Sequence, residues 1–231
     1  NLVQTAEGGP ALVHAGPFAN IAHGCSSKIS TRLGLSVADY VVTEGGFGFD
    51  LGGEKFLDIK CRSLGVFPRV LVLVATLRAL KMHGGIPAKL AGEPNAEALH
   101  KGLEHLDKHL ESAKFYGLPV VVCINEFPTD KPDELEAAEK AIGERGVRAV
   151  RCQGFARGGE GAEAFARVVV EVAEATDAAP PQPRFVYDLD EPYAKKIEKV
   201  ARTIYGASGI AIAPAAEKEI ARIEKMAYRN L

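Results

Sequence analysis

Short apolar segments alternate along the chain with longer amphipathic ones. The apolar segments are rich in Val and Ile and show little polar alternation, which is typical of strands buried on both faces of a parallel sheet. The predicted strands are residues 11–14, 40–43, 70–75, 119–124, 147–151 and 209–213. Helical periodicity predicts helices at residues 19–33, 52–63, 96–115, 132–144, 161–175, 193–204 and 215–227. This order predicts an α/β fold with a mostly parallel sheet and helices on both faces, in Rossmann-like or P-loop NTPase-like layers.

Two loose segments interrupt the pattern. Residues 84–95 contain three glycines and two prolines, and residues 177–183 contain three prolines. We place a domain boundary near residue 108, within the long helical pattern that follows the first loose segment. Both ends are unusual: the chain starts without Met and stops directly after a helical pattern.

Composition narrows the class of protein. The chain is 47% hydrophobic and 25% charged, which is ordinary for a globular protein, and its net charge of -2 argues against a nucleic-acid-binding surface. No apolar window is long enough for a transmembrane helix, and the first residues are not those of a signal peptide. We therefore expect a cytoplasmic protein that acts on small molecules and binds neither nucleic acid nor membrane.

The residues that most often bind metals are not clustered in the sequence. The four cysteines are widely spaced, which indicates scattered core thiols. His105 and His109 share a helical face, but the charged residues around them indicate a solvated surface. We predict no metal site, and we interpret His23 as a core histidine, with a ligand-facing role as the alternative.

Ligands of open parallel sheets bind beyond the carboxyl ends of the strands. The first unusual strand exit is the segment 43–54, which has five glycines and leads into a predicted helix. Glycines allow close backbone approach, and free amides at a helix start suit an anionic or carbonyl-bearing ligand. The ending Gly-Lys-Ser/Thr of a phosphate-binding P-loop is absent here. The alternative is a flexible turn capped by Asp50.

Two further strand exits carry an aromatic residue. Segment 125–130 places Phe127 after the most apolar strand, as a possible platform for a ring, although the same residues also read as a helix start. Segment 154–161 combines Phe155 and Arg157 with glycines, which suits a ligand with a ring and a carboxylate or phosphate. A plain loop explains the second segment equally well.

Several of these stretches resemble the formate–tetrahydrofolate ligase family. Residues 10–14 and 16–25 resemble that family's PA(F/L)VHGGPFANIAHGC, and residues 38–56 resemble ADYVVTEAGFGADLGAEKF. The resemblance continues, in order along the whole chain, through residues 76–85, 124–125, 127–130, 158–161 and 223–226.

The resemblance implies a reaction. In that family ATP phosphorylates formate to formyl phosphate, and N10 of tetrahydrofolate captures the formyl group to give 10-formyltetrahydrofolate. The family's ATP-binding P-loop lies upstream of the region matched here, so the sites for ATP and Mg²⁺ are expected mostly outside this chain. The family also continues beyond the last residues matched here, so we expect an internal fragment whose sheet is incomplete at both ends and which is inactive alone. Residues 1–108 are expected in the nucleotide and formyl-transfer domain, and residues 109–231 are expected to bind folate. We further expect either a homo-oligomer or a partner supplying the N-terminal part. The alternatives are an inactive folate-binding module and a degenerate fragment.

The resemblance also assigns residues. Phe127 and Phe155 match the family's aromatic pair that sandwiches the folate ring, and we predict a slot about 7 Å wide between them, twice an aromatic stacking distance. Pro128 and Asn125 belong to the same folate-binding exit, and Arg157 is expected to meet a carboxylate of the folate's glutamate tail.

The catalytic residues implied are Phe47 and Gly48, which match the loop beside the formyl-transfer centre, together with Glu44 on the same loop. The chain departs from the family at positions that include these four residues. Phe155 replaces Trp, Arg157 replaces Lys, and Phe49 and Gly53 replace alanines. The bulk of Phe49 is expected to alter the formyl pocket.

Overall fold

The computed structural model describes residues 1–13 and 25–226, which form two compact units. The sheet unit comprises Gln4–Gly9 and Pro68–Gln182, and the helical unit comprises Asn1–Val3, Pro10–Phe67 and Pro183–Leu231. Residue 108, where we expected a boundary, lies inside a helix of the sheet unit. The division of substrates between residues 1–108 and 109–231 stays a prediction.

The sheet unit is built on three parallel strands. β3 (Leu71–Ala75), β4 (Val120–Asn125) and β5 (Arg148–Cys152) lie in the order β3-β4-β5. Leu73 pairs with Val122, and Cys123 pairs with Val150. The uninterrupted apolar run of β4 is explained by its central position, where both edges and both faces are covered. The predicted α/β fold with a parallel sheet is confirmed.

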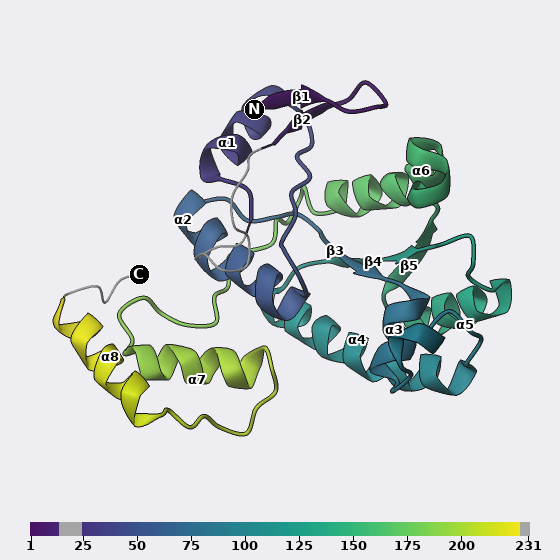
Figure 1. The fold of residues 1–231 in the computed structure, drawn as a ribbon. Coiled ribbons are helices and arrows are strands. Elements are labelled where there is room, and N and C mark those ends of the chain that lie inside the picture. Colours follow the sequence, from purple (N-terminus) through teal and green to yellow (C-terminus); the bar gives the residue numbers. More distant parts are fainter. Residues whose placement is uncertain (14–24, 227–231) are drawn as a thin grey trace. The chain divides into compact units, whose positions relative to one another are not determined.

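Helices cover both faces of this sheet (Figure 1). α3 (Leu77–His83), α4 (Ala96–Tyr116) and α5 (Pro132–Gly143) lie on one side, and α6 (Gly154–Glu174) lies on the other. A short 3₁₀ turn, η3 (Ala88–Leu90), precedes α4. Asn95 caps α4 by accepting the Ala98 N–H at 2.8 Å, and Gly117 ends the helix in the left-handed conformation. Leucines of α4 at helical spacing (Leu99, Leu103, Leu106 and Leu110) form the core with the strands.

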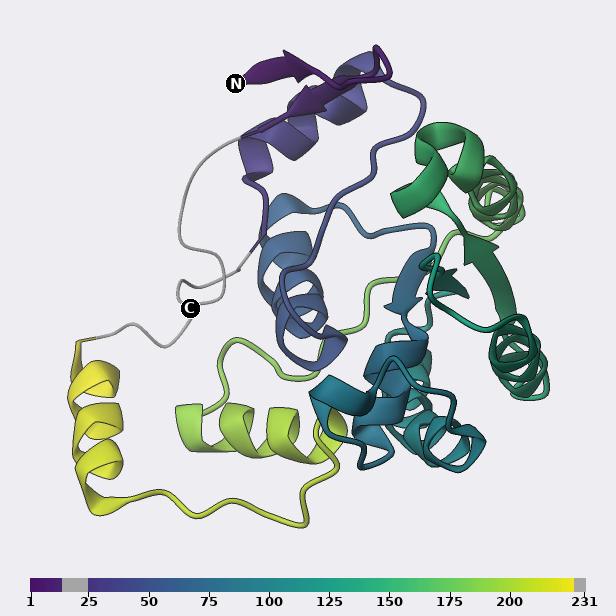
Figure 2. The same cartoon turned by 45° about the vertical axis from the view of Figure 1, so that its right-hand side comes forward.

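The helical unit joins two distant stretches of sequence. Its elements are α1 (Lys28–Val37), two π-helical segments η1 (Phe49–Gly53) and η2 (Phe56–Cys61), α2 (Arg62–Leu64), α7 (Tyr193–Thr203) and α8 (Pro214–Lys225), which Figure 2 shows from a second side. Buried Asp58 of η2 accepts the Val186 N–H at 2.8 Å. Arg62 donates to the Tyr187 carbonyl at 2.6 Å and lies 4.1 Å from the centre of the Phe185 ring. These contacts attach the segment before α7 to η2 and α2.

Three predicted strands do not join the parallel sheet. Residues 40–43 and 209–213 form no strand, and β2 (Pro10–Leu12) pairs only with β1 (Leu2–Gln4) in a two-stranded sheet. Apolar β-branched residues indicate that a segment is suited to burial. They do not indicate whether a neighbouring strand is present to pair with it. His14, the last residue of the strand predicted at 11–14, lies outside the described residues.

Helix boundaries differ in three places. The helix expected at 19–33 begins at Lys28, and residues 19–24 lie outside the described part of the chain. The helix expected at 52–63 is largely of the wider π type. The helix expected at 161–175 starts earlier, at Gly154, because α6 includes a kink at Gly158.

Candidate functional site

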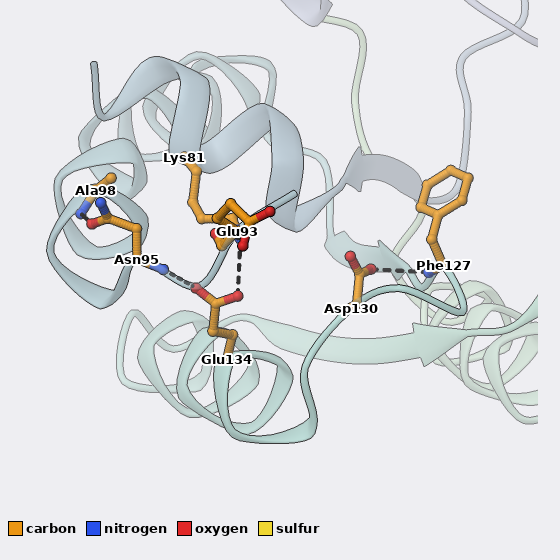
Figure 3. Close-up of polar contacts among 7 residues, drawn as sticks. All are labelled: Lys81, Glu93, Asn95, Ala98, Phe127, Asp130 and Glu134. Carbon is orange, nitrogen blue, oxygen red and sulfur yellow. Dashed lines mark hydrogen bonds and ion pairs between the residues drawn. The ribbon is translucent and has the colours of Figure 1, made fainter. Parts of the chain in front are cut away.

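The turn after β4 is held by one carboxylate. Asp130 accepts the Phe127 N–H at 2.9 Å, and its own N–H donates to the Phe127 carbonyl at 2.9 Å (Figure 3). This double contact closes a tight turn directly at the carboxyl end of the sheet. The turn fixes the backbone of Phe127, leaves Pro128 exposed, and is followed by Pro132 in the first turn of α5. The ligand-platform and helix-start interpretations of this segment are therefore compatible.

A glutamine connects this turn to the exit of β5. The Gln153 side chain donates to Glu126 at 2.9 Å and accepts from Arg157 at 3.2 Å. Both ends of one amide are thereby engaged, so its orientation is fixed. The backbone adds a further link between the same exits, because the Glu126 N–H donates to the Cys152 carbonyl at 2.9 Å. Asn125 lies at this edge too, paired in register with Cys152.

The two aromatic rings meet at this edge. The ring centroids of Phe127 and Phe155 are 5.0 Å apart with 49° between the planes, and Phe155 is 70% exposed. The expected spacing of about 7 Å is absent, because the exposed Phe155 ring buries apolar area by contacting the half-buried Phe127 ring. Opening a slot for a third ring requires rotation of one side chain, and the exposure of Phe155 leaves room for it.

The start of α6 presents backbone amides to a carboxylate. Gly158 has φ 57° and ψ −142°, a conformation that strongly favours glycine, and it separates the first turn from the long part of the helix. The Gly159 N–H donates to the Glu7 carboxylate, which comes from the turn between β1 and β2. Arg157, in contrast, is engaged with Gln153 and with Glu160, the latter at 2.5 Å. Sequence reasoning did not identify Glu7, Gln153 or Asp130 as residues that shape this edge. Of the three, only Asp130 had a local signal in the sequence, as a candidate helix cap.

In the helical unit, the glycine-rich loop is strained at one position. Phe47 has φ 66°, a left-handed conformation that costs a side-chain-bearing residue about 1 to 2 kcal/mol. Its ring is exposed, and Gly48 follows it as the residue before η1. Glu44 is also exposed. Strain of this kind is concentrated at functional loops, and here it holds the Phe47 ring on the surface of the loop.

Phe49 and Gly53 form one packing unit inside η1. Phe49 is buried, and its ring lies where a Cβ at position 53 would stand. The effect of Phe49 on the shape of a formyl pocket stays a prediction. Glycine at position 53 leaves free the space that the edge of the Phe49 ring occupies.

This packing unit makes a testable prediction. We expect Gly53→Ala to lower the free energy of unfolding by about 1 to 3 kcal/mol, because the added methyl overlaps the Phe49 ring. The same substitution should cost far less in a Phe49→Ala background. Urea unfolding of the four chains of this cycle measures the coupling. Equal costs of Gly53→Ala in both backgrounds would contradict the packing described here.

A cavity of about 410 Å³ lies between η1 and α7 within the helical unit. Glu54, Tyr187, Tyr193, Lys196 and Tyr205 contribute its polar groups and rings. Burial raises the pKa of Glu54 to about 8, and the negative charge of Asp58 and a hydrogen bond between the two carboxyl groups act in the same direction. Burial also lowers the pKa of Lys196. Glu54 is thus held protonated near neutral pH, sharing its proton with Asp58.

Several predicted features are not part of these groups. His23 lies outside the described residues. In residues 1–13 and 25–226, no group of three or more His, Cys, Asp or Glu side chains is arranged to hold a metal ion. Across the same residues, every helix is too short or too polar to cross a membrane.

The fold defines a class: an α/β protein with a parallel sheet, whose candidate site residues follow the carboxyl ends of the strands. Comparison with known proteins then gives the family. The model of the family described as "Formate--tetrahydrofolate ligase" matches residues 1–231. The chain is 56% identical over 231 residues to a formate–tetrahydrofolate ligase of Myxococcus xanthus, and 51% identical over 232 residues to one of Methylobacterium nodulans. This chain belongs to the formate–tetrahydrofolate ligase family.

The chain is shorter than these relatives. The alignments cover 100% of the chain but only 42% of the Myxococcus xanthus protein and 41% of the Methylobacterium nodulans protein. A third relative, from another Methylobacterium strain, is 50% identical with 41% of its length covered. The matched region is thus less than half of each relative.

Proposed function

We propose that this chain forms the tetrahydrofolate-binding part of a formate–tetrahydrofolate ligase, which joins formate to tetrahydrofolate at the expense of ATP. The observation that supports this most directly is the meeting of Phe127 and Phe155 at the carboxyl edge of the sheet. Core phenylalanines bury their rings, whereas Phe155 is largely exposed. Two such rings suit a flat heterocycle such as the pterin.

Each group at the edge has a role in this proposal. The two rings bind the faces of the pterin once Phe155 has rotated, and the Gln153 amide holds the two ring-bearing exits together. Pro128 and Asn125 border the ring site. The Gly159 amide already binds a carboxylate, that of Glu7, which supports a carboxylate of the glutamate tail as a ligand close to Arg157.

The formyl-transfer residues are proposed on the loop of the helical unit. The strained backbone of Phe47 supports a functional role for this loop, with Gly48 allowing close approach of the reacting group and Glu44 as an exposed carboxylate. These residues would orient formyl phosphate; the phosphoryl transfer itself needs groups that bind ATP.

The residues of this chain do not fit a phosphate-binding P-loop. The dipeptide Gly-Lys, which such a loop requires, occurs nowhere in the 231 residues. We therefore propose that ATP and Mg²⁺ bind to another part of the ligase, and that the chain alone makes no 10-formyltetrahydrofolate. The family and four buried thiols that form no disulfide in the described residues support the cytoplasm as the place of action.

We expect Phe155→Ala to weaken tetrahydrofolate binding by about 1 to 3 kcal/mol, because the ligand loses one stacked face. Phe127→Ala should have a similar effect. Since Phe155 is exposed, its replacement should leave the melting temperature nearly unchanged. Isothermal titration calorimetry with the purified chain measures the affinity, and Phe165→Ala, on the long part of α6, is the matched control. Unchanged affinity in both ring variants would remove the proposed function from this edge.

If the chain binds tetrahydrofolate but shows no turnover when the rest of a ligase is added, it is a folate-binding module and not part of an active ligase. The ring pair at the sheet edge supports this second candidate as well, because binding a ring needs no ATP site. Turnover of the chain together with the remainder of a ligase separates the two.

A further inference from the structure

Glu126 lies beside both of the exits that carry the aromatic rings. It follows β4 directly, and its N–H donates to the Cys152 carbonyl at 2.9 Å, which holds its backbone against the end of β5. Its side chain accepts from Gln153 at 2.9 Å. Phe127 is the next residue along the chain, and Phe155 follows Gln153 by two positions. The Glu126 carboxylate is therefore held in a fixed place next to the ring pair.

This carboxylate can accept more hydrogen bonds than Gln153 supplies. A carboxylate has about four acceptor positions on its two oxygens, and Gln153 donates to one oxygen. Arg157, which donates to the other end of the Gln153 amide, forms its ion pair with Glu160. Glu126 is half-buried, so a ligand bound at this edge would exclude water from its carboxylate. A carboxylate that loses water needs donors in exchange, and a ligand at this edge is the natural source of them.

A pterin ring has suitable donors along one edge. Its 2-amino group and the adjacent N3–H point in the same direction, and their spacing matches a carboxylate as two N–H groups of an arginine do. A ring bound between Phe127 and Phe155 stacks through its faces, so its edges meet the groups beside the slot. The Glu126 carboxylate is such a group.

We propose, on the basis of the proposed tetrahydrofolate site, that Glu126 selects the pterin by accepting from its 2-amino group and N3–H. Stacking alone admits any flat ring of suitable size, because both faces of an aromatic ring can stack whatever its edge carries. The carboxylate adds discrimination, since a ring without these donors leaves it buried and unpaired. Gln153 keeps the carboxylate in position before the ligand arrives, which lowers the cost of binding.

A purely structural role for Glu126 does not require a carboxylate. The backbone bond from Glu126 to Cys152 already joins the two exits, and the pairing of Asn125 with Cys152 does so as well. An amide at position 126 would still accept from Gln153 through its oxygen. Glu126→Gln therefore retains the link between the exits, while it places an amide N–H₂ where the pterin needs an acceptor.

Calorimetric titration with two ligands tests this role. The ligands are tetrahydrofolate and its 2-desamino-2-methyl counterpart, in which a methyl group replaces the 2-amino group. We expect Glu126→Gln to weaken tetrahydrofolate binding by about tenfold or more, and to weaken binding of the methyl ligand by about threefold or less. The melting temperature should stay close to that of the parent chain. Glu163→Gln, at an exposed position of α6, is the matched control and should leave both affinities unchanged.

Two results would overturn the role of Glu126: an unchanged affinity for tetrahydrofolate in Glu126→Gln, or an equal loss for both ligands. Each is distinct from failure of the proposed function. If Phe155→Ala abolishes tetrahydrofolate binding while Glu126→Gln leaves it unchanged, the ring site stands and Glu126 has no part in it. If the parent chain does not bind tetrahydrofolate, the proposed function and the role of Glu126 fail together.

Discussion

Lys81→Met is expected to lower the free energy of unfolding by about 3 to 5 kcal/mol, because it leaves a buried carboxylate without its cation. Lys81 of α3 and Glu134 of α5 are 2% and 5% exposed, and their charged atoms lie 2.9 Å apart. Figure 3 shows the two side chains converging from their helices. Lys81 also donates to the Glu93 carbonyl at 2.8 Å, and Glu134 accepts the Asn95 N–H at 2.8 Å. One ion pair thus connects α3, α5 and the start of α4.

A second substitution, at Glu134, distinguishes the effect of the buried charge from the effect of packing. Adding Glu134→Gln to Lys81→Met should recover much of the loss, because the amide oxygen still accepts from Asn95 while no buried charge remains. The matched control is Lys108→Met, which breaks an exposed ion pair with Glu111 and should cost about 0 to 1 kcal/mol. Chemical unfolding measures all three. Equal losses for Lys81→Met and Lys108→Met would show that the buried pair does not stabilise the fold.

Glu54→Gln is expected to make the chain markedly more stable at pH 8.5 while changing little at pH 5. Folding raises the pKa of Glu54 to about 8, against about 4.5 in the unfolded chain. The stability that this group contributes is therefore fully present below about pH 4.5 and is lost as pH rises through 8. Ionisation at high pH places two carboxylates together in a buried site, since Asp58 is 1% exposed. Glutamine cannot ionise, and its amide can donate to Asp58 as the protonated acid does.

The expected difference between the two chains grows to the order of 3 kcal/mol between pH 5 and 8.5. Urea midpoints at several pH values measure it. Glu136→Gln, at an exposed position of α5, serves as the control and should follow the parent chain at every pH. Parallel profiles for Glu54→Gln and the parent would mean that the two carboxyl groups do not share a proton.

The sheet unit could be predicted from local pattern, and the residues that hold its edge could not. The apolar run of β4 and the leucine spacing of α4 are signals that need no knowledge of neighbours. The contact between Glu7 and Gly159 joins residues 152 positions apart, and the turn around Glu7 has no feature that points to it. The resemblance brought Phe127 and Phe155 together, but their direct contact depends on side-chain rotation, which sequence does not encode.

In the helical unit, the sequence pattern predicted an element that the structure does not contain. The pattern at residues 40–43 predicted a strand in a sheet, and the segment is extended but unpaired with any strand of the described residues. The pattern correctly describes which faces suit burial. It does not say whether a neighbouring strand is present.

The contact between Phe49 and Gly53 restricts the order in which these residues can have arisen. The family pattern has alanine at both positions, and phenylalanine at 49 overlaps any Cβ at 53. A chain that acquired phenylalanine first would have passed through an overpacked intermediate, whereas glycine first costs only backbone freedom in a helical turn. The permissive route therefore runs through glycine at 53. With phenylalanine at 49, alanine at 53 carries the expected cost of about 1 to 3 kcal/mol, so each of these positions restricts which residue the other can carry.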